Sequence, residues 1–189
     1  MNDHCNFAIL ITVSMLLQKE VFGDEVSEEC QKVNINDLDL FYRCCRLPDL
    51  KLTDEKKAIA QNCHRSVAGE LPSPNPEDEE IYECFEECYF NASRWLTSDL
   101  KPNEAAIISE YDEELKSFPQ WREHITKTIK TCAINDFYRP EAKCKSGSYQ
   151  FSKCLGKNIF LNCPEDGWQG NDETCTSMKV IYEQCLIIF

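Results

Sequence analysis

The chain has 189 residues, and its 33 acidic against 20 basic side chains give a formal net charge of −13. This length predicts one domain with extensions, and a hydrophobic content of 42% is enough for a packed core. The negative charge disfavours nucleic acids and anionic membrane surfaces as partners, because both attract basic proteins. With 13 cysteines and 6 glycines, we expect a compact, acidic, cysteine-rich globule rather than a turn-rich β-sandwich.

An apolar run at residues 7–17 precedes the rest of the chain. It is too short to cross a membrane, which takes about 20 residues, and is typical of the core of a secretory signal peptide. Cleavage after Gly23 would remove residues 1–23 with Cys5 and leave an even number of cysteines, 12, which can close six disulfides. A buried N-terminal helix is the alternative. Because many cysteines favour an oxidising compartment, we expect a secreted, extracellular protein with no stable membrane insertion.

The first two predicted helices have recognisable starts. One covers residues 53–67, with Thr53 as its cap and acidic residues in its first turn. A proline-rich hinge at 72–76 separates it from the second helix, which begins at Pro76 and reaches Trp95. Hydrophobic residues recur in the second helix at helical spacing, so one of its faces is expected to be buried.

Three further helices are expected downstream. The third covers residues 103–118, with Glu110 and other acidic residues on its outer face, and the fourth covers 119–132. A last helix is expected over 172–188. The stretch 134–170 shows no regular hydrophobic period and is predicted to be irregular. Strand signals are weak throughout, so the sequence predicts an all-α fold.

The cysteine spacing constrains how the helices are joined. Cys84 and Cys88 lie one turn apart on a predicted helix, so each can bond a different neighbour. Cys44 and Cys45 are adjacent, which is too close for a bond between them, and are expected to have different partners. Six disulfides exceed what a domain of this size ordinarily needs. This excess favours a hollow bundle, in which disulfides replace core volume.

The cysteine spacing also resembles a known family. Twenty residues separate Cys63 from Cys84, three separate Cys84 from Cys88, and 43 separate Cys88 from Cys132. This pattern is similar to the framework of insect odorant-binding proteins. The end of the chain resembles their Plus-C subfamily, in which a proline follows the sixth framework cysteine. Its matching residues are Cys144, Cys154, Cys163, Pro164 and Cys175.

The resemblance implies a disulfide-stapled helical bundle of the odorant-binding type. Residues 24–189 would form one domain with a core at about 53–164, an N-terminal extension at 24–52 and a C-terminal extension at 165–189. Carried over position by position, it also implies the bonds Cys63–Cys88, Cys84–Cys154 and Cys132–Cys163. Three further bonds of unassigned pairing would use Cys30, Cys44, Cys45, Cys144, Cys175 and Cys185.

Hydrophobic side chains on converging helix faces are the candidate ligand-binding residues. Ordinary core packing is the alternative for each of them. The resemblance implies a secreted carrier, which would bind a small hydrophobic odorant-like ligand in an apolar cavity. An odorant receptor or another odorant-binding protein would be a further partner. The alternative function is a secreted protein-binding factor with a filled core. The candidate residues are Tyr89, Trp95, Tyr111, Leu115, Phe118, Trp121, Ile125 and Ile129.

No catalytic residue, metal site or cofactor is expected. His64 and His124 lie in no catalytic motif, so an enzyme is not predicted. The acidic run 77–80 lacks the glycine turn of a calcium loop and suits a helix start instead. Asn91 begins the sequence Asn-Ala-Ser, which is an N-glycosylation motif.

Overall fold

The computed structural model describes residues 38–50, 52–70 and 79–185. Regular structure in this part of the chain is helical, with only two isolated β-bridges, which confirms the predicted all-α class. None of the described helices is long and apolar enough to cross a bilayer. The predicted signal peptide, Cys5, Cys30 and the proline hinge lie outside the described residues. The helices are α2 (Leu38–Cys44), α3 (Asp54–Glu70), α4 (Glu79–Ala92), α5 (Glu104–Glu114), α6 (Pro119–Ala133), α7 (Ser148–Leu161) and α8 (Glu173–Cys185).

The chain divides into two compact units, one of residues 38–169 and one that contains α8. Helix α2, which the sequence assigned to an N-terminal extension, belongs to the same unit as α3 to α7. In the other unit, α8 begins where predicted. The Asp172 carboxylate accepts hydrogen bonds from the backbone nitrogens of Thr174 (2.8 Å) and Cys175 (3.3 Å), which caps the helix.

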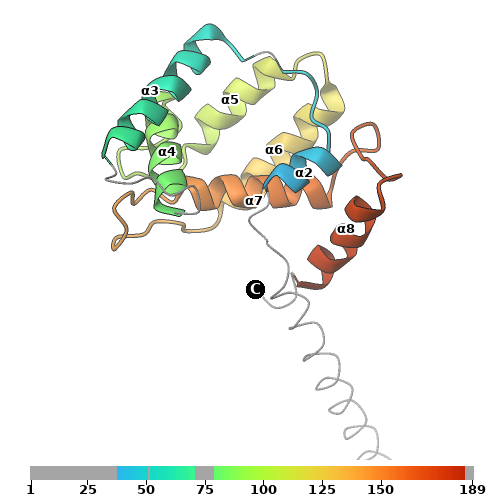
Figure 1. The fold of residues 1–189 in the computed structure, drawn as a ribbon. Helices are drawn as coiled ribbons and strands as arrows, with labels where there is room; N and C mark the ends of the chain where they lie inside the picture. The colour runs from blue at the N-terminus through green and yellow to red at the C-terminus, as the bar shows by residue number, and fades with distance from the viewer. Residues whose placement is uncertain (1–37, 51, 71–78, 186–189) are drawn as a thin grey trace, which may run out of the picture. The chain divides into compact units, whose positions relative to one another are not determined.

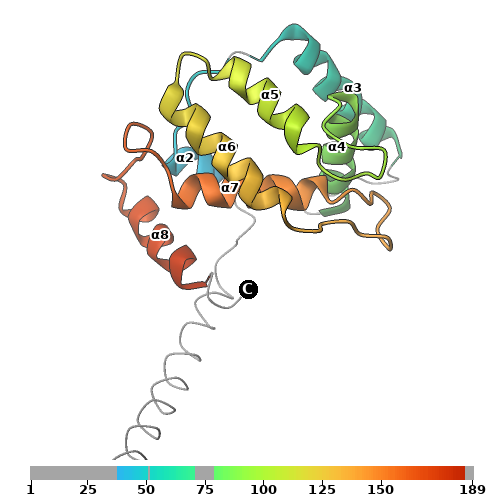
Figure 2. The same ribbon diagram turned by 180° about the vertical axis from the view of Figure 1, so that it is seen from behind.

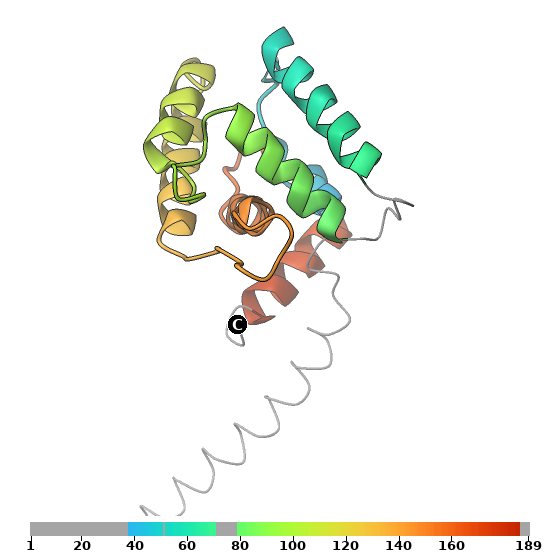
Figure 3. The same ribbon diagram turned by 90° about the vertical axis from the view of Figure 1, so that its left-hand side faces the viewer.

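Helix α7 is the base of the larger unit. It packs against α2, α4 and α6, while α3 packs on α4 and α5 packs on α6. The view in Figure 3 looks along α7 and shows the α3–α4 pair on one side and the α5–α6 pair on the other. Figure 2 shows the same arrangement from behind. Helix α7 therefore contacts both helix pairs, through α4 of one pair and α6 of the other.

The prediction that residues 134–170 are irregular is wrong, because this stretch contains α7. The helix follows Gly147, whose φ of 67° is left-handed, and side chains on several of its sides are buried. A helix buried on several sides has no polar face and so no clean hydrophobic stripe. Its buried residues are Ser148, Tyr149, Phe151, Gly156, Ile159 and Phe160.

The second predicted helix ends earlier than expected. Helix α4 stops at Ala92, and Arg94 takes a left-handed backbone conformation with φ of 60°. The Trp95 backbone nitrogen then donates to the Phe90 carbonyl oxygen at 2.7 Å. This turn returns the Trp95 side chain to the core that α4 helps to form, where its ring meets the Phe90 ring edge-on at 5.2 Å.

The disulfides confirm one of the three bonds that the resemblance implied. Cys63 is bonded to Cys88, which joins α3 to α4. The implied bonds Cys84–Cys154 and Cys132–Cys163 are wrong, because the structure has the two bonds Cys84–Cys144 and Cys132–Cys154. The cause is α7: it places Cys154 beside α6, while the segment before α7 brings Cys144 to α4.

The bonding of Cys44 and Cys45 confirms the prediction that these adjacent cysteines have different partners. Cys45 is bonded to Cys163, 118 positions away, and Cys44 is disulfide-bonded as well. The two neighbours therefore have different partners. Cys175 is also disulfide-bonded, whereas the side chain of Cys185 lies outside the described part.

Candidate functional site

The structure brings all but one of the predicted ligand-binding residues into one hydrophobic cluster. Phe118 is the exception, since it is 39% exposed at the start of α6. Its predicted inward position is wrong, because the chain turns at Phe118 before Pro119 begins the helix. Tyr89 and Tyr111 are partly buried. The fully or nearly fully buried members are Trp95, Leu115, Trp121, Ile125 and Ile129.

A row of aromatic rings runs from one helix pair to the other. It starts on α4, where Phe85 stacks on Tyr89 with 6.3 Å between ring centroids. Tyr89 meets Trp95 edge-on at 5.8 Å, and Trp95 lies 5.9 Å from Tyr111 on α5. Such contacts add to the stability that burial alone provides. The row therefore connects α4 to α5 through rings in contact with one another.

An open recess lies at the outer end of this row. Its volume is about 480 Å³, and Phe85 forms one wall. The volume lies within the range of about 300–1,000 Å³ of small-molecule sites, but this recess is wide open to solvent, whereas such sites enclose most of their ligand. Sequence reasoning missed this recess because its α3 wall shows no hydrophobic stripe. That wall consists of Ala60, Gln61, His64 and Arg65.

A partly buried ion pair joins the two helix pairs beside the aromatic row. The ammonium of Lys56 on α3 lies 2.6 Å from a carboxylate oxygen of Glu110 on α5, and the side chains are 12% and 26% exposed. Trp95 Nε1 donates to the other oxygen of Glu110 at 2.7 Å. The ammonium also lies 4.4 Å from the Trp95 ring and 5.5 Å from the Tyr89 ring, within cation–π range. The prediction that Glu110 lies on the outer face of its helix is therefore wrong.

Uncharged hydroxyl and carboxyl groups are favoured next to this pair. Burial raises the pKa of Tyr111 and of Tyr89, and neighbouring acidic groups add to both shifts. The pKa of Glu114 is raised by burial and by the nearby Glu110 carboxylate. Tyr42 on α2 keeps 49% of its surface exposed, yet burial also raises the pKa of its hydroxyl. The tyrosine hydroxyls can donate or accept hydrogen bonds without bringing a charge into the unit.

Glu86 is the acidic group on α4 with the largest shift. Burial raises its pKa to about 7, and the Ser152 hydroxyl of α7, which donates to the carboxylate at 3.2 Å, opposes this rise. Its charge also contributes to the raised pKa of Tyr42 and of Tyr89. A carboxyl group with this pKa exchanges its proton near neutral pH. It can therefore act as either a hydrogen-bond donor or an acceptor.

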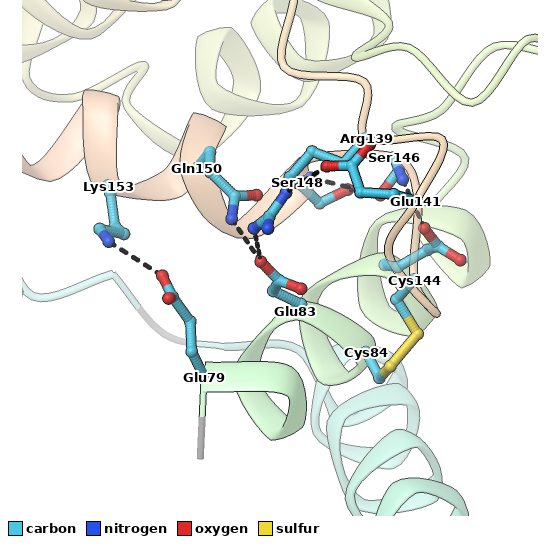
Figure 4. A network of polar contacts seen from close by, with 11 residues as sticks. Glu79, Glu83, Cys84, Arg139, Glu141, Cys144, Ser146, Ser148, Gln150 and Lys153 are labelled. Atoms are coloured by element: carbon cyan, nitrogen blue, oxygen red, sulfur yellow. Dashed lines mark hydrogen bonds and ion pairs between the residues drawn. A yellow bond between two sulfur atoms is a disulfide. The ribbon is translucent and has the colours of Figure 1, made fainter. Parts of the chain in front are cut away.

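Two other acidic residues of α4, Glu79 and Glu83, make polar contacts with α7 and the segment before it, which we call the polar seam (Figure 4). The buried Glu83 pairs with Arg139 and accepts a hydrogen bond from Gln150 Nε2 at 2.6 Å. Near the start of α4, Glu79 pairs with Lys153 at 3.2 Å. The Cys84–Cys144 bond closes the same seam. These groups hold α4 in place and have their partners within the protein.

The two histidines of the described residues lie on different helices, His64 on α3 and His124 on α6. His64 lines the recess, whereas His124 of α6 has a buried Nε2 and a pKa lowered mainly by burial. Within the described residues, no three His, Cys, Asp or Glu side chains are arranged to hold a metal ion. Asn91 is exposed in the last turn of α4, and its glycosylation stays a prediction.

Comparisons with protein-family models, curated proteins and solved structures find no match. The resemblance to odorant-binding proteins is therefore carried by the cysteine spacing alone. The recess, the aromatic row and the ion pair are the features on which a function can be argued.

Proposed function

We propose that this chain is a secreted carrier, of the kind that insect odorant-binding proteins represent, for a small hydrophobic ligand. The observation that carries the proposal is the continuity of the recess with the aromatic row, since Phe85 belongs to both. The ligand would lie against Phe85 and Tyr89, with its far end toward Tyr111. No covalent chemistry is needed for such a function.

The binding energy would come from removal of apolar surface from water. A ligand that buries about 300 Å² gains about 7.5 kcal/mol at 25 cal/mol per Å². The loss of translational and rotational freedom reduces this gain. Aromatic contacts to the rings of Phe85 and Tyr89 add to it. Together these contributions leave a modest net binding free energy, which corresponds to a dissociation constant of about tens of micromolar or weaker.

A polar end on the ligand would find partners among the uncharged hydroxyl and carboxyl groups. Tyr89 and Tyr111 are the two neighbours of Trp95 in the row, and Glu86 lies on the same helix as Tyr89. Small-molecule sites typically combine an apolar wall with a few such groups that fix the orientation. We therefore expect a ligand with an apolar body and one hydrogen-bonding end.

The test is displacement of the fluorescent probe N-phenyl-1-naphthylamine from the oxidised protein. Saturable binding with competition by small apolar compounds is the expected result. Phe85→Ala and Tyr89→Ala should weaken probe binding by about tenfold, as expected for loss of a central aromatic contact. Phe118→Ala is the matched control and should leave binding unchanged, because Phe118 is exposed and outside the cluster. Absence of saturable binding to the correctly bonded protein would contradict the proposal.

A secreted protein-binding factor is the second candidate. It is supported by the buried core, where Leu115 and Ile129 are almost wholly removed from solvent. Exposed rings such as Tyr82 and Tyr138 would then contribute to a protein contact. Failure of the probe experiment, together with a loss of partner capture on Tyr138→Ala, would favour this candidate.

A further inference from the structure

The glycosylation motif at the end of α4 has no part in the proposed ligand site. Asn91, Ala92 and Ser93 form the sequence Asn-x-Ser, and no other Asn-x-Ser or Asn-x-Thr with x other than proline occurs in the chain. Helix α4 ends at Ala92, and in the turn that follows the Arg94 backbone nitrogen donates to the Asn91 carbonyl oxygen at 3.0 Å. The motif therefore spans the boundary between a helix and a turn.

The Asn91 side chain is exposed and makes no contact on which the fold depends. Its neighbours Ala92 and Arg94 are exposed as well. The Asn91 side-chain amide forms no hydrogen bond with any of the described residues. A bulky group attached to this amide would therefore extend into solvent and displace no hydrogen-bond partner.

Most other asparagine side chains of the described residues take part in hydrogen bonds. The Asn62 oxygen accepts a bond from an arginine of α3, and the Asn103 oxygen caps α5. The Asn158 amide donates to a backbone carbonyl oxygen within α7 at 2.9 Å. A substituent on any of these three amides would interfere with a contact inside the protein. Asn91 differs from them in having its amide free.

Helix α4 does not prevent modification of Asn91, because the helix is not stable when the motif is synthesised. An isolated helix of 14 residues is marginal in water. Helix α7, against which α4 packs, begins only at Ser148, and Cys144 lies 60 positions after its disulfide partner Cys84. An enzyme can therefore reach the motif before the later part of the chain folds against α4.

A group on Asn91 would leave the recess open. Phe85, which forms one wall of the recess, lies six residues before Asn91 on α4. At about 100° per residue, the two side chains leave the helix in directions about 120° apart. The motif also contributes no residue to the lining of the recess. The group and a ligand in the recess would therefore lie on different sides of α4.

We infer that Asn91 carries an N-linked glycan in the secreted protein. This inference rests on the secreted location that belongs to the proposed function. In the transfer, Asn91 Nδ2 forms a bond to C1 of the first sugar of a lipid-linked oligosaccharide diphosphate. The bond from C1 to the diphosphate oxygen breaks, the lipid diphosphate leaves, and the amide nitrogen loses one proton. The transferring enzyme recognises the motif through the Ser93 hydroxyl.

Expression of the full chain in cultured human cells tests the inference. Peptide-N-glycosidase F should lower the apparent mass of the secreted protein and leave an aspartate at the glycosylated position, which mass spectrometry of the peptide identifies. Asn91→Gln and Ser93→Ala should each abolish this mass change. Asn171→Gln is the matched control and should keep the mass change, because Asn171 is exposed but begins no glycosylation motif.

The outcomes separate the glycan from the carrier function. A secreted protein whose mass the glycosidase does not change would overturn the inference, and so would a mass change that persists in Asn91→Gln. Protein that stays in the cytosol without a glycan would contradict the secreted location and overturn both proposals.

Displacement of N-phenyl-1-naphthylamine assesses the carrier function of the same samples. The glycosylated and the deglycosylated protein should bind the probe equally, because Asn91 and the recess lie on different sides of α4. A glycosylated protein that binds no probe would contradict the carrier function and retain the glycan at Asn91.

Discussion

Cys84 and Cys88 lie one turn apart on α4, yet their disulfides run to different neighbours. Cys88 is bonded to Cys63 on α3, and Cys84 is bonded to Cys144 in the segment before α7. Side chains four residues apart lie on the same face of a helix, one turn apart. Each can therefore reach a different neighbouring segment. This arrangement holds α4 from two sides and fixes the wall of the recess that Phe85 contributes.

The first prediction concerns the pairing of the cysteines. Digestion of the non-reduced protein should release one linked peptide pair with Cys84 and Cys144 and another with Cys132 and Cys154. The Cα atoms of these pairs lie 5.0 and 5.9 Å apart, as disulfide geometry requires. Mass spectrometry before and after reduction identifies the peptides. Recovery of a Cys84–Cys154 peptide would contradict the fold described for α7.

A second prediction concerns the start of α7. Gly147 has φ of 67°, and a Cβ atom there would overlap the carbonyl oxygen of Phe137. Gly147→Ala should therefore lower the free energy of unfolding by at least about 2 kcal/mol, since strain and a backbone clash combine. Gly69→Ala is the control, because a Cβ at Gly69 meets no atom within 4 Å and alanine favours the helix. Urea unfolding of both variants makes the comparison, and equal midpoints would contradict the geometry at Gly147.

Helix starts could be predicted where the signal is local. The fourth predicted helix begins with Pro119 at its first position, and the structure has α6 from Pro119 to Ala133 with Trp121 and Ile129 buried as expected. The third predicted helix starts at residue 103, and in the structure the Asn103 side chain caps α5 by accepting from the Ala106 backbone nitrogen at 3.2 Å. A proline or a cap acts within one turn, so neighbouring helices do not change its effect.

The features that the sequence did not predict depend on neighbours. Helix α7 was missed because burial on several sides removes the periodic pattern. Glu110 was expected in solvent, but Trp95 and Lys56 reach it from outside its own helix. The recess wall from Ala60 to Arg65 is part of a site only because Phe85 lies opposite on α4. The position of α7, the burial of Glu110 and the recess all depend on contacts between helices. The periodicity of a single helix carries no information about such contacts.

A third prediction tests the polar seam between α4 and α7. Glu83 is buried and accepts from Gln150 while it pairs with Arg139. Glu83→Ala should lower the free energy of unfolding by about 2 kcal/mol, because Gln150 loses a partner in a partly buried place. Glu113→Ala is the control, since its pair with Lys116 is exposed and should contribute less than about 0.5 kcal/mol. Urea unfolding at pH 7 measures both, and similar losses would show that burial of Glu83 has no special weight.

The last prediction follows from the carboxyl group of Glu86. Burial raises its pKa from 4.5 to about 7, so the folded state holds a proton that the unfolded state releases. Between these two values the folded chain binds more protons, and stability must fall as the pH rises. The contribution of Glu86 is fully present below pH 4.5 and is lost as the pH rises through 7.

Glu86→Gln removes this dependence, because a glutamine is neutral at every pH and can still accept from Ser152. At pH 8 the free energy of unfolding of the variant should exceed that of the unmodified protein by about 2 kcal/mol, a figure already reduced because Glu86 is partly exposed. At pH 5 the two free energies should differ little. Chemical unfolding across this range checks the difference, with the exposed Glu113→Gln as the control at each pH. Two parallel profiles would mean that Glu86 ionises as freely in the fold as in the unfolded chain. In that case the carboxyl group could not serve as a neutral hydrogen-bond donor to a ligand.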